Sequence, residues 1–439
     1  MQSTRTLPVN WKRDSIRSIV DPVRPITYGV VQPGERLKQG IPIIRGQDYS
    51  RGVVDHSDLY LIHPNIADAY KRSSVEGGDI LFSIVGYLGQ TAVVPASLRG
   101  ANITQTTARI AVKPPNVSRF FLHQFRSDLF APEVRKHQKG SAQPGVNLSD
   151  VEKMLVVIPP PEDQTRIAAV LDTVDEAIAK TEAVIAKLKQ VRAGLLHDFL
   201  TRGLDENGQL RDPIAHPEQF KDSPLGRIPK EWEVATVEEL DLLIIDGDRG
   251  SNYPNESQLF EQGYCVFLNN KNIVDGRFDF SAAQFISEER DALLGKGKLS
   301  GGDIVITTRG TVGNIALFSE LRPYQHIRIN SGMIIVRGYE DIFVDGFFVA
   351  VWKFLFPSEY RRLSSGSAQP QFPIRDMKQF RFLVPKKAEQ ERIVSASSTV
   401  ESALAEQQRV LAKLIPLKSG LMNDLLTGRV RVAFEIGNV

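Results

Sequence analysis

A long internal repeat restricts the possible folds of this chain more than any other feature. Residues 140–144, Gly-Ser-Ala-Gln-Pro, recur at 366–370, and the offset of 226 residues then continues without a gap. Matches at this offset are Asp150/Asp376, Pro159/Pro385, Gln164/Gln390, Arg166/Arg392, Ile167/Ile393, Lys187/Lys413, Gly194/Gly420 and Asp198/Asp424. Chance similarity does not hold one register over so long a stretch. The chain therefore contains a duplicated unit.

The match continues upstream with small shifts. The motif Gly-Gly-Asp-Ile at residues 77–80 recurs at 301–304, an offset of 224. Gly86 and Gly89 recur as Gly310 and Gly313 at the same offset, and Trp11 recurs as Trp232 at an offset of 221. The two copies thus differ by small insertions in their first parts and agree in length later.

Each copy begins with short apolar runs separated by turn residues, which is typical of strands. The runs are 42–45, 79–85 and 91–94 in the first copy, and 266–269, 303–307 and 314–318 in the second. The glycines near them do not form a phosphate loop, because no Gly-Lys-Ser/Thr follows. The pattern predicts an α+β fold with two sheet-centred domains.

Each copy then continues as one long helix, residues 162–200 in the first copy. Apolar positions alternate three and four apart, which is the heptad spacing of a coiled coil. The seam positions are Leu171, Val174, Ile178, Thr181, Ile185, Leu188, Arg192, Leu195 and Phe199, then Ser397, Val400, Leu404, Gln407, Leu411, Leu414, Lys418, Leu421 and Leu425. Two long helices that pair with each other are predicted. The alternative is that each helix packs only on its own domain.

Pro416 stands inside the second helix, where the first copy has Gln190. Proline removes one helical hydrogen bond and clashes with the preceding turn, so a kink is expected just before Pro416. At ~1.5 Å per residue, each helix would span roughly 57 Å and could act as a rigid spacer.

Charge and cysteine content limit the partners and the compartment. Residues 1–150 carry 19 Lys/Arg against 12 Asp/Glu, whereas residues 216–375 carry 17 against 22. The basic first region suggests a polyanion as partner, and in the acidic region such contact must come from local clusters or from partner subunits. The chain has a single cysteine, Cys265, which fits a reducing compartment. It has no apolar run of about 20 residues and no recognisable signal peptide. We therefore expect a cytoplasmic protein away from the membrane.

Motifs of common catalysts are missing. Gly297-Lys298 is followed by Leu299 rather than by the hydroxyl residue of a phosphate loop, and no dinucleotide fingerprint follows a strand. The Pro-Pro pairs at 114–115 and 159–160 lack the flanking residues of an amino-methyltransferase, and no histidine pair has zinc spacing. We therefore expect no catalytic residue, metal or cofactor, and binding is favoured over catalysis.

The duplicated sheet domain with its long helix resembles the specificity subunits of type I restriction–modification systems. Residues 220–232, Phe-Lys-Asp-Ser-Pro-Leu-Gly-Arg-Ile-Pro-Lys-Glu-Trp, are similar to that family's entry to the second recognition domain. Residues 158–167 and 384–393 are similar to its signature before the helix, and residues 425–430 to its C-terminal motif. Together these motifs cover essentially the whole chain.

The resemblance implies a circular, pseudo-twofold protein with antiparallel helices. The first target recognition domain would be 1–150 and the second 216–375, with helical spacer regions at 151–215 and 376–439. Two methyltransferase subunits would dock on the helices, restriction (motor-nuclease) subunits would join, and S-adenosylmethionine would belong to the methyltransferase partner. The double-stranded DNA target would be bipartite, with half-sites about 34 Å apart, near one helical turn.

Polar clusters just after predicted strands, polar pairs just before them and polar residues in the glycine-punctuated loops are the candidates for DNA contact. They are Arg45, Gln47, Asp48, Gln105 and Thr106 in the first copy, and Asn269, Asn270, Lys271, Asn272, Arg309, Thr311 and Asn330 in the second. The alternative is that these are solvated turns and plain hairpins. Gln143 and Gln369, in the repeated loops before the helices, are interpreted as structural because a duplicated loop would not distinguish two half-sites.

Two other functions are weighed against DNA reading. A coiled-coil scaffold that binds no DNA explains the helices and the acidic second region, but not two divergent sheet domains. A nuclease or methyltransferase in its own right lacks the motifs it would need.

Overall fold

The computed structural model describes residues 7–140, 144–274, 276–319, 324–364 and 370–432. It divides into two compact units, Met1–Val184 with Gln407–Val439 and Ile185–Glu406, named here the first and second unit. Gln143 and Gln369, predicted to be structural, lie outside the described residues.

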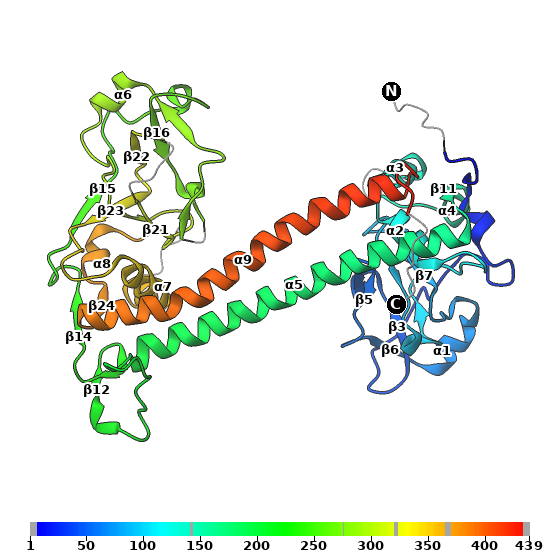
Figure 1. Ribbon diagram of the computed structural model, residues 1–439, viewed down its shortest axis with the longest axis horizontal. Helices are drawn as coiled ribbons and strands as arrows, with labels where there is room; N and C mark the ends of the chain where they lie inside the picture. Colours follow the sequence, from blue (N-terminus) through cyan, green and yellow to red (C-terminus); the bar gives the residue numbers. More distant parts are fainter. Residues whose placement is uncertain (1–6, 141–143, 275, 320–323, 365–369, 433–439) are drawn as a thin grey trace. The chain divides into compact units, whose positions relative to one another are not determined.

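Within its described residues, the first unit contains three small sheets and a hairpin (Figure 1). Its strands are β1 (Lys12–Ser15), β2 (Thr27–Tyr28), β3 (Ile41–Ile44), β4 (Tyr49–Ser50), β5 (Val53–Val54), β6 (Tyr60–Ile62), β7 (Ile80–Ser83), β8 (Thr91–Val93), β9 (Asn102–Ile103), β10 (Thr107–Ile110) and β11 (Leu155–Ile158). The strand orders are β1-β11, β2-β10-β7-β8 and β6-β3-β9, with β4-β5 as the hairpin. Its short helices are α1 (Pro64–Ala69), α2 (Ser118–Phe125), α3 (Ala131–His137) and α4 (Leu148–Lys153).

The second unit contains the same arrangement and one additional hairpin. Its strands are β12 (Phe220–Ser223), β13 (Gly226–Pro229), β14 (Glu233–Thr236), β15 (Leu243–Asp246), β16 (Cys265–Leu268), β17 (Ile273–Val274), β18 (Arg277–Phe278), β19 (Gln284–Ile286), β20 (Ile304–Thr307), β21 (Ile315–Leu317), β22 (Ile327–Ile329), β23 (Met333–Arg337) and β24 (Arg381–Val384). The orders β14-β24, β15-β23-β20-β21 and β19-β16-β22 repeat those of the first unit, β17-β18 repeats its hairpin, and β12-β13 is added. Its short helices are α6 (Glu288–Leu293), α7 (Asp345–Leu363) and α8 (Ile374–Lys378).

The equivalent sheets confirm the predicted α+β fold and its duplication. In both units the central strand of the three-stranded sheet has one parallel and one antiparallel neighbour. All six apolar runs form strands, as predicted. β11 and β24 follow the predicted domain limits at 150 and 375, yet β11 pairs with β1 and β24 pairs with β14, each a strand inside the preceding recognition domain.

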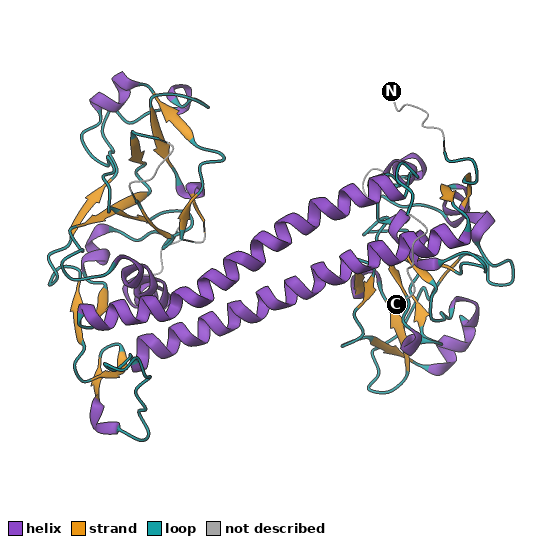
Figure 2. Cartoon of the chain, viewed as in Figure 1, coloured by secondary structure: helices purple, strands orange, loops and turns teal. Residues whose placement is uncertain are grey.

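The predicted long helices are present as α5 (Pro161–Arg202) and α9 (Lys387–Leu425), each traced as one uninterrupted helix (Figure 2). All the seam positions except Arg192 are buried or half-buried. The mostly apolar seam positions are thus shielded from solvent at least in part, as heptad spacing requires. α9 continues through Pro416; the kink and the detailed coiled-coil packing stay predictions.

Ion pairs show that the helices run antiparallel within each unit. In the first unit Lys418 contacts Asp175, while Arg431, further along the chain, contacts Asp163 at 3.2 Å. In the second unit Arg192 lies 3.4 Å from Glu401, while the backbone N–H of Leu204 donates to Glu389. In each unit, contacts of later residues in or just after α5 are thus made with earlier residues in or just after α9, which is the antiparallel arrangement.

A buried glutamine at the start of each long helix connects the helix to its domain. Gln164 accepts a hydrogen bond from the Val117 N–H at 2.9 Å and donates to the Pro159 carbonyl at 2.8 Å. Gln390 accepts from the Val344 N–H at 2.9 Å and donates to the Pro385 carbonyl at 2.8 Å. Both amides are fully buried and satisfied, which explains why this glutamine recurs in the motif before each helix.

Candidate DNA-recognition surface

Four of the predicted reading residues of the first unit meet at one hollow of about 350 Å³. Its lining includes Arg45, Gln47, Gln105 and Thr106. The topology explains the meeting: β3 and β9 are parallel, so the segments that follow them leave the sheet at the same edge. The loop after β7 joins them through a hydrogen bond from the Ile84 N–H to the Thr106 carbonyl, 2.8 Å.

The fifth predicted residue of that unit, Asp48, has its side chain turned inward. Its carboxylate accepts from the backbone N–H of Arg45 at 2.8 Å and from the Arg45 guanidinium at 2.8 and 2.9 Å. Asn272 occupies the same place in the second unit and accepts from the Asn269 N–H at 2.8 Å. Both side chains are buried, and they stabilise the turns that carry the exposed neighbours Gln47 and Lys271. Their part in reading DNA stays a prediction.

In the second unit three predicted residues converge around Gly332. A Cβ built on this glycine would lie 3.2 Å from Asn270 Oδ1, 3.3 Å from Asn330 Oδ1 and 3.6 Å from Arg309 Cβ. The Asn270 amide also donates to the carbonyl of Arg309. Lys271, Arg309 and Thr311 are exposed, whereas Asn269 and Asn330 are half-buried. The structure thus gathers the predicted residues of each unit on one end of its sheets.

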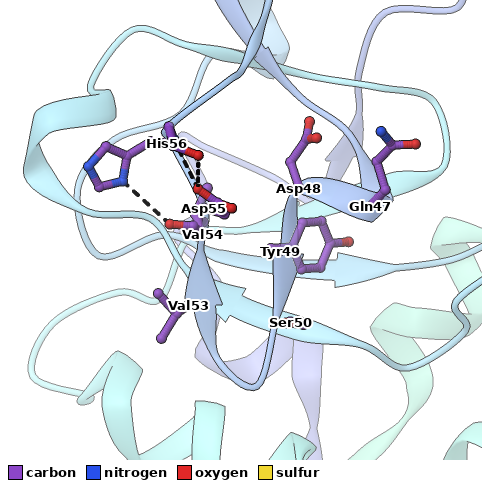
Figure 3. Close-up of a pocket in the computed structure, with 9 residues that line it drawn as sticks. Gln47, Asp48, Tyr49, Ser50, Val53, Val54, Asp55 and His56 are labelled. Carbon is purple, nitrogen blue, oxygen red and sulfur yellow. Dashed lines mark hydrogen bonds between the residues drawn. The ribbon is translucent and has the colours of Figure 1, made fainter. Parts of the chain in front are cut away.

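A neighbouring hollow of about 480 Å³ lies beside the β4–β5 hairpin of the first unit. Figure 3 shows Gln47 and Asp48 side by side where the turn enters β4, with Tyr49 next to them. Tyr49 is buried and its hydroxyl lies 3.1 Å from Thr107 Oγ1; burial raises the pKa of Tyr49 to about 12. At the hairpin tip, Arg51 forms an ion pair with Glu182 of α5, 2.7 Å.

Two residues at these surfaces were missed by the sequence reasoning. Tyr87 lines the first hollow and is 62% exposed. Arg249 lines a hollow of about 310 Å³ in the second unit together with Arg309, and donates to Asp246 and to the Ser331 carbonyl. The sequence search considered polar residues next to strands. An aromatic residue between two turn glycines, as at Tyr87, is a further signal that could have been used.

The described residues hold no cluster of three or more histidine, cysteine or acidic side chains suited to a metal ion. Within the same residues, no helix is both long and apolar enough to cross a membrane. The gathered side chains are hydrogen-bond donors, acceptors and cations, which suit contacts to phosphates and base edges.

The model of the family "Type I restriction modification DNA specificity domain" matches residues 34–190 and 229–414. The type I restriction enzyme MjaIX specificity subunit of Methanocaldococcus jannaschii is 22% identical over 444 residues, which covers 97% of this chain and 95% of the relative. The EcoBI specificity subunit of Escherichia coli is 32% identical over 192 residues, covering 42% of this chain and 40% of the relative.

Solved structures share the fold. The type I restriction-modification S subunit from M. genitalium is 15% identical, with a TM-score of 0.58 and coverage of 97% of this chain and 98% of that one. A chain from a study of complex assembly in a type I R-M system is 18% identical, with a TM-score of 0.54 and coverage of 97% and 100%. With two family-model matches that cover most of its length, this chain belongs to the type I restriction–modification DNA specificity family, as a non-catalytic, sequence-specific DNA-binding subunit.

Proposed function

We propose that each recognition domain reads one half-site of a bipartite double-stranded DNA target. The supporting observation is that the two units have the same topology but different side chains at the gathered loop positions. A shared scaffold with different side chains is what two different half-sites require, because base edges are distinguished by donor and acceptor patterns. Backbone amides at the glycine turns would contact phosphate, which positions the protein without specifying sequence.

The exposed or half-buried candidates are the residues assigned here to DNA contact. They are Arg45, Gln47, Gln105 and Thr106 in the first unit, and Asn269, Asn270, Lys271, Arg309, Thr311 and Asn330 in the second. Asp48 and Asn272 would act through the turns that they stabilise. Few of these side chains are cations, so partner subunits would supply much of the salt-dependent phosphate contact.

The helices would be the docking surface for two methyltransferase subunits, which carry S-adenosylmethionine, and restriction subunits would join this assembly in the cytoplasm. The support is the incomplete burial of the seam. Val174, Leu188, Val400, Leu411 and Leu414 remain half-exposed in this chain alone. Apolar surface that two helices do not cover is suited to packing against further helices.

The decisive experiment maps methylated sites in a host that carries this subunit and its methyltransferase. We expect one bipartite motif with a fixed unread spacing. A continuous motif, or no motif despite an assembled complex, would contradict the proposal.

Exchanging the first recognition domain tests the division of labour. Domain limits of 1–150, 151–215, 216–375 and 376–439 are proposed. Replacing residues 1–150 with the domain of another family member should change one half-site and preserve the other. A change in both half-sites would show that the domains do not read independently.

Lengthening the helical spacer tests its role as a ruler. Insertion of a helical turn into α5 should change the unread spacing and leave both half-sites intact. The scaffold alternative predicts no specific DNA complex at any salt concentration, even with methyltransferase present, so a gel-shift titration separates the two functions.

A further inference from the structure

One loop has the same backbone in both units but presents different side chains. It follows β7 in the first unit and β20 in the second, at residues 83–90 and 307–314. The Gly89 N–H donates to the Ser83 carbonyl at 2.9 Å, and the Gly313 N–H donates to the Thr307 carbonyl at 2.8 Å. Gly86, Gly89, Gly310 and Gly313 all have positive φ, 78°, 81°, 70° and 92°. The loop geometry is therefore fixed by glycine and is independent of the residue between the glycines.

The residue after the first loop glycine is Tyr87 in the first unit and Thr311 in the second. In the turn after β3 or β16 the size difference is reversed: the first unit has the small Gly46, and the second unit has the larger Asn270. A Cβ on Gly46 would lie 3.7 Å from Tyr87 Cδ2, so the ring lies directly beside this glycine. In the first unit the large Tyr87 is therefore paired with Gly46, which has no side chain. In the second unit the small Thr311 is paired with Asn270, whose side chain occupies the turn.

In the second unit the Asn270 side chain reaches back to the loop. Its amide donates to the Arg309 carbonyl, and a Cβ built on Gly310 would overlap Asn270 Nδ2. The two units consequently offer different chemistry at the same place. The first offers an aromatic ring, and the second offers a bound amide beside a short hydroxyl residue.

We propose that Tyr87 is a specificity-determining residue of the first half-site, and that its ring contacts the C5-methyl group of a thymine in the major groove. The inference rests on the proposed function and names one base contact within it. The ring is 62% exposed in a hollow that it shares with the polar residues Arg45, Gln47 and Gln105. The apolar residues Val30, Val31, Pro33 and Val85 also line this hollow, so an apolar group of the DNA would find further apolar contacts there. Among the groups that base pairs present in the major groove, the thymine methyl is the apolar one, and apolar side chains recognise it.

The test uses the complex of the full chain with its methyltransferase, after the motif has been mapped and the half-site of the first unit identified by the domain exchange. Each thymine of that half-site is replaced in turn by deoxyuridine, which removes the methyl group and keeps the base pair. The wild-type complex should lose about 5- to 20-fold in kcat/KM for methylation at a single position. Y87S should be slower on the natural site and should no longer distinguish thymine from uracil there, whereas Y87F should retain the distinction.

A matched control is Y28S, since Tyr28 is also exposed in the first unit but does not line the hollow. This variant should discriminate like the wild type. Uracil tolerated at every position by the wild type, a half-site without thymine in either strand, or equal discrimination in Y87S and wild type would overturn the inference. A wild-type complex that methylates no bipartite motif would instead contradict the proposed function, so the two failures are distinguishable.

Discussion

The two units fix their recognition domain to the long helix with opposite chemistry. In the first unit α2 meets α5 through polar and ionic contacts. Arg119 and the buried His123 both bond to Asp172, His123 at 2.7 Å, and Arg126 at the end of α2 contacts Asp175 at 2.9 Å. In the second unit the positions equivalent to Arg119 and His123 are Gly346 and Ala350 on α7. There, α7 and the long helices border a mostly apolar groove of about 480 Å³.

The second unit places its buried charge elsewhere, between α7 and β24. Glu359 is 1% exposed and accepts from Arg362, from Arg381 and from the Arg381 backbone N–H at 3.0 Å. Its counterpart Glu133 accepts from the Leu155 backbone N–H at 3.2 Å and from a largely exposed arginine, Arg13, at 3.3 Å, and His137 lies 4.0 Å away. Aromatic pairs at the same helix positions, Phe120-Phe121 and Phe347-Phe348, are buried in both units. The duplicated fold therefore depends on the shared apolar positions, while the ionic contacts were free to move.

Removing Glu359 should have the largest effect. E359A would leave Arg362 and Arg381 without their buried partner and should destabilise the second unit by about 3 kcal/mol. E133A, the matched change in the first unit, should cost less because its arginine partner is already in water. Hydrogen exchange of α7 and α2 amides measures each unit separately, and equal losses would contradict the comparison.

Removing Asp172 should have the next largest effect, now in the first unit. D172A leaves Arg119 and His123 without their shared acceptor and should destabilise the α2–α5 contact by roughly 2 kcal/mol. S398A changes the equivalent position in the second unit and should be nearly neutral. Melting temperatures equal to that of the wild type for both variants would show that the Asp172 contact does not stabilise the first unit.

As the pH falls, the free energy of unfolding of the first unit should decrease at a higher pH than that of the second unit. Burial lowers the pKa of His123 and outweighs the opposing effect of Asp172, so unfolding takes up a proton and stability falls as the pH drops below the ordinary histidine value of about 6.5. Burial alone would raise the pKa of Glu359, but hydrogen bonds from Arg362 and Arg381 outweigh it and lower this pKa to about 2. The stability from Glu359 is thus complete above the unfolded value of about 4.3 and is lost between there and pH 2.

Hydrogen exchange at pH 7, 6 and 5 checks this order. α2 amides should exchange faster, relative to the intrinsic rate, as the pH falls, whereas α7 amides should remain protected. H123Q should remove the pH dependence of exchange protection in α2. Loss of protection in α2 and α7 at the same pH would contradict the predicted order.

The helix ion pairs should give the smallest effect. Arg192 and Glu401 are each about half exposed, 47% and 51%, so R192A should cost at most about 0.5 kcal/mol. K418A should cost more, because Lys418 and Asp175 are mostly buried, at 16% and 22% exposed. Thermal unfolding of the two variants in parallel measures the difference, and high salt should reduce the R192A effect to nothing.

Local patterns in the sequence were sufficient for the repeat, the strands and the long helices, because each depends on the spacing of apolar residues and glycines. The heptad positions from Leu171 to Leu425 follow from a 3.5-residue period that the sequence displays directly. The role of Gln164 was not predictable, since its partners Val117 and Pro159 are set by tertiary packing.

The candidate site was predicted in part. Polar residues after parallel strands meet because of topology, which is why Arg45, Gln47, Gln105 and Thr106 share one hollow. Which of them turns inward could not be read from the sequence, because Asp48 and Gln47 are both polar and only the turn geometry separates them. Tyr87 was missed because an aromatic residue in a loop resembles a core residue until its exposure is known.

The ion pairs along the helices have a consequence for the origin of the chain. Asp175 and Arg192 on α5 match Glu401 and Lys418 on α9 at the offset of 226, and each acid faces the base of the other helix. Each helix thus carries an acid and a base whose places interchange when the helix is turned end for end. Such a helix is complementary to a copy of itself, so tandem copying of one ancestral gene would have preserved both of these pairs without a compensating substitution.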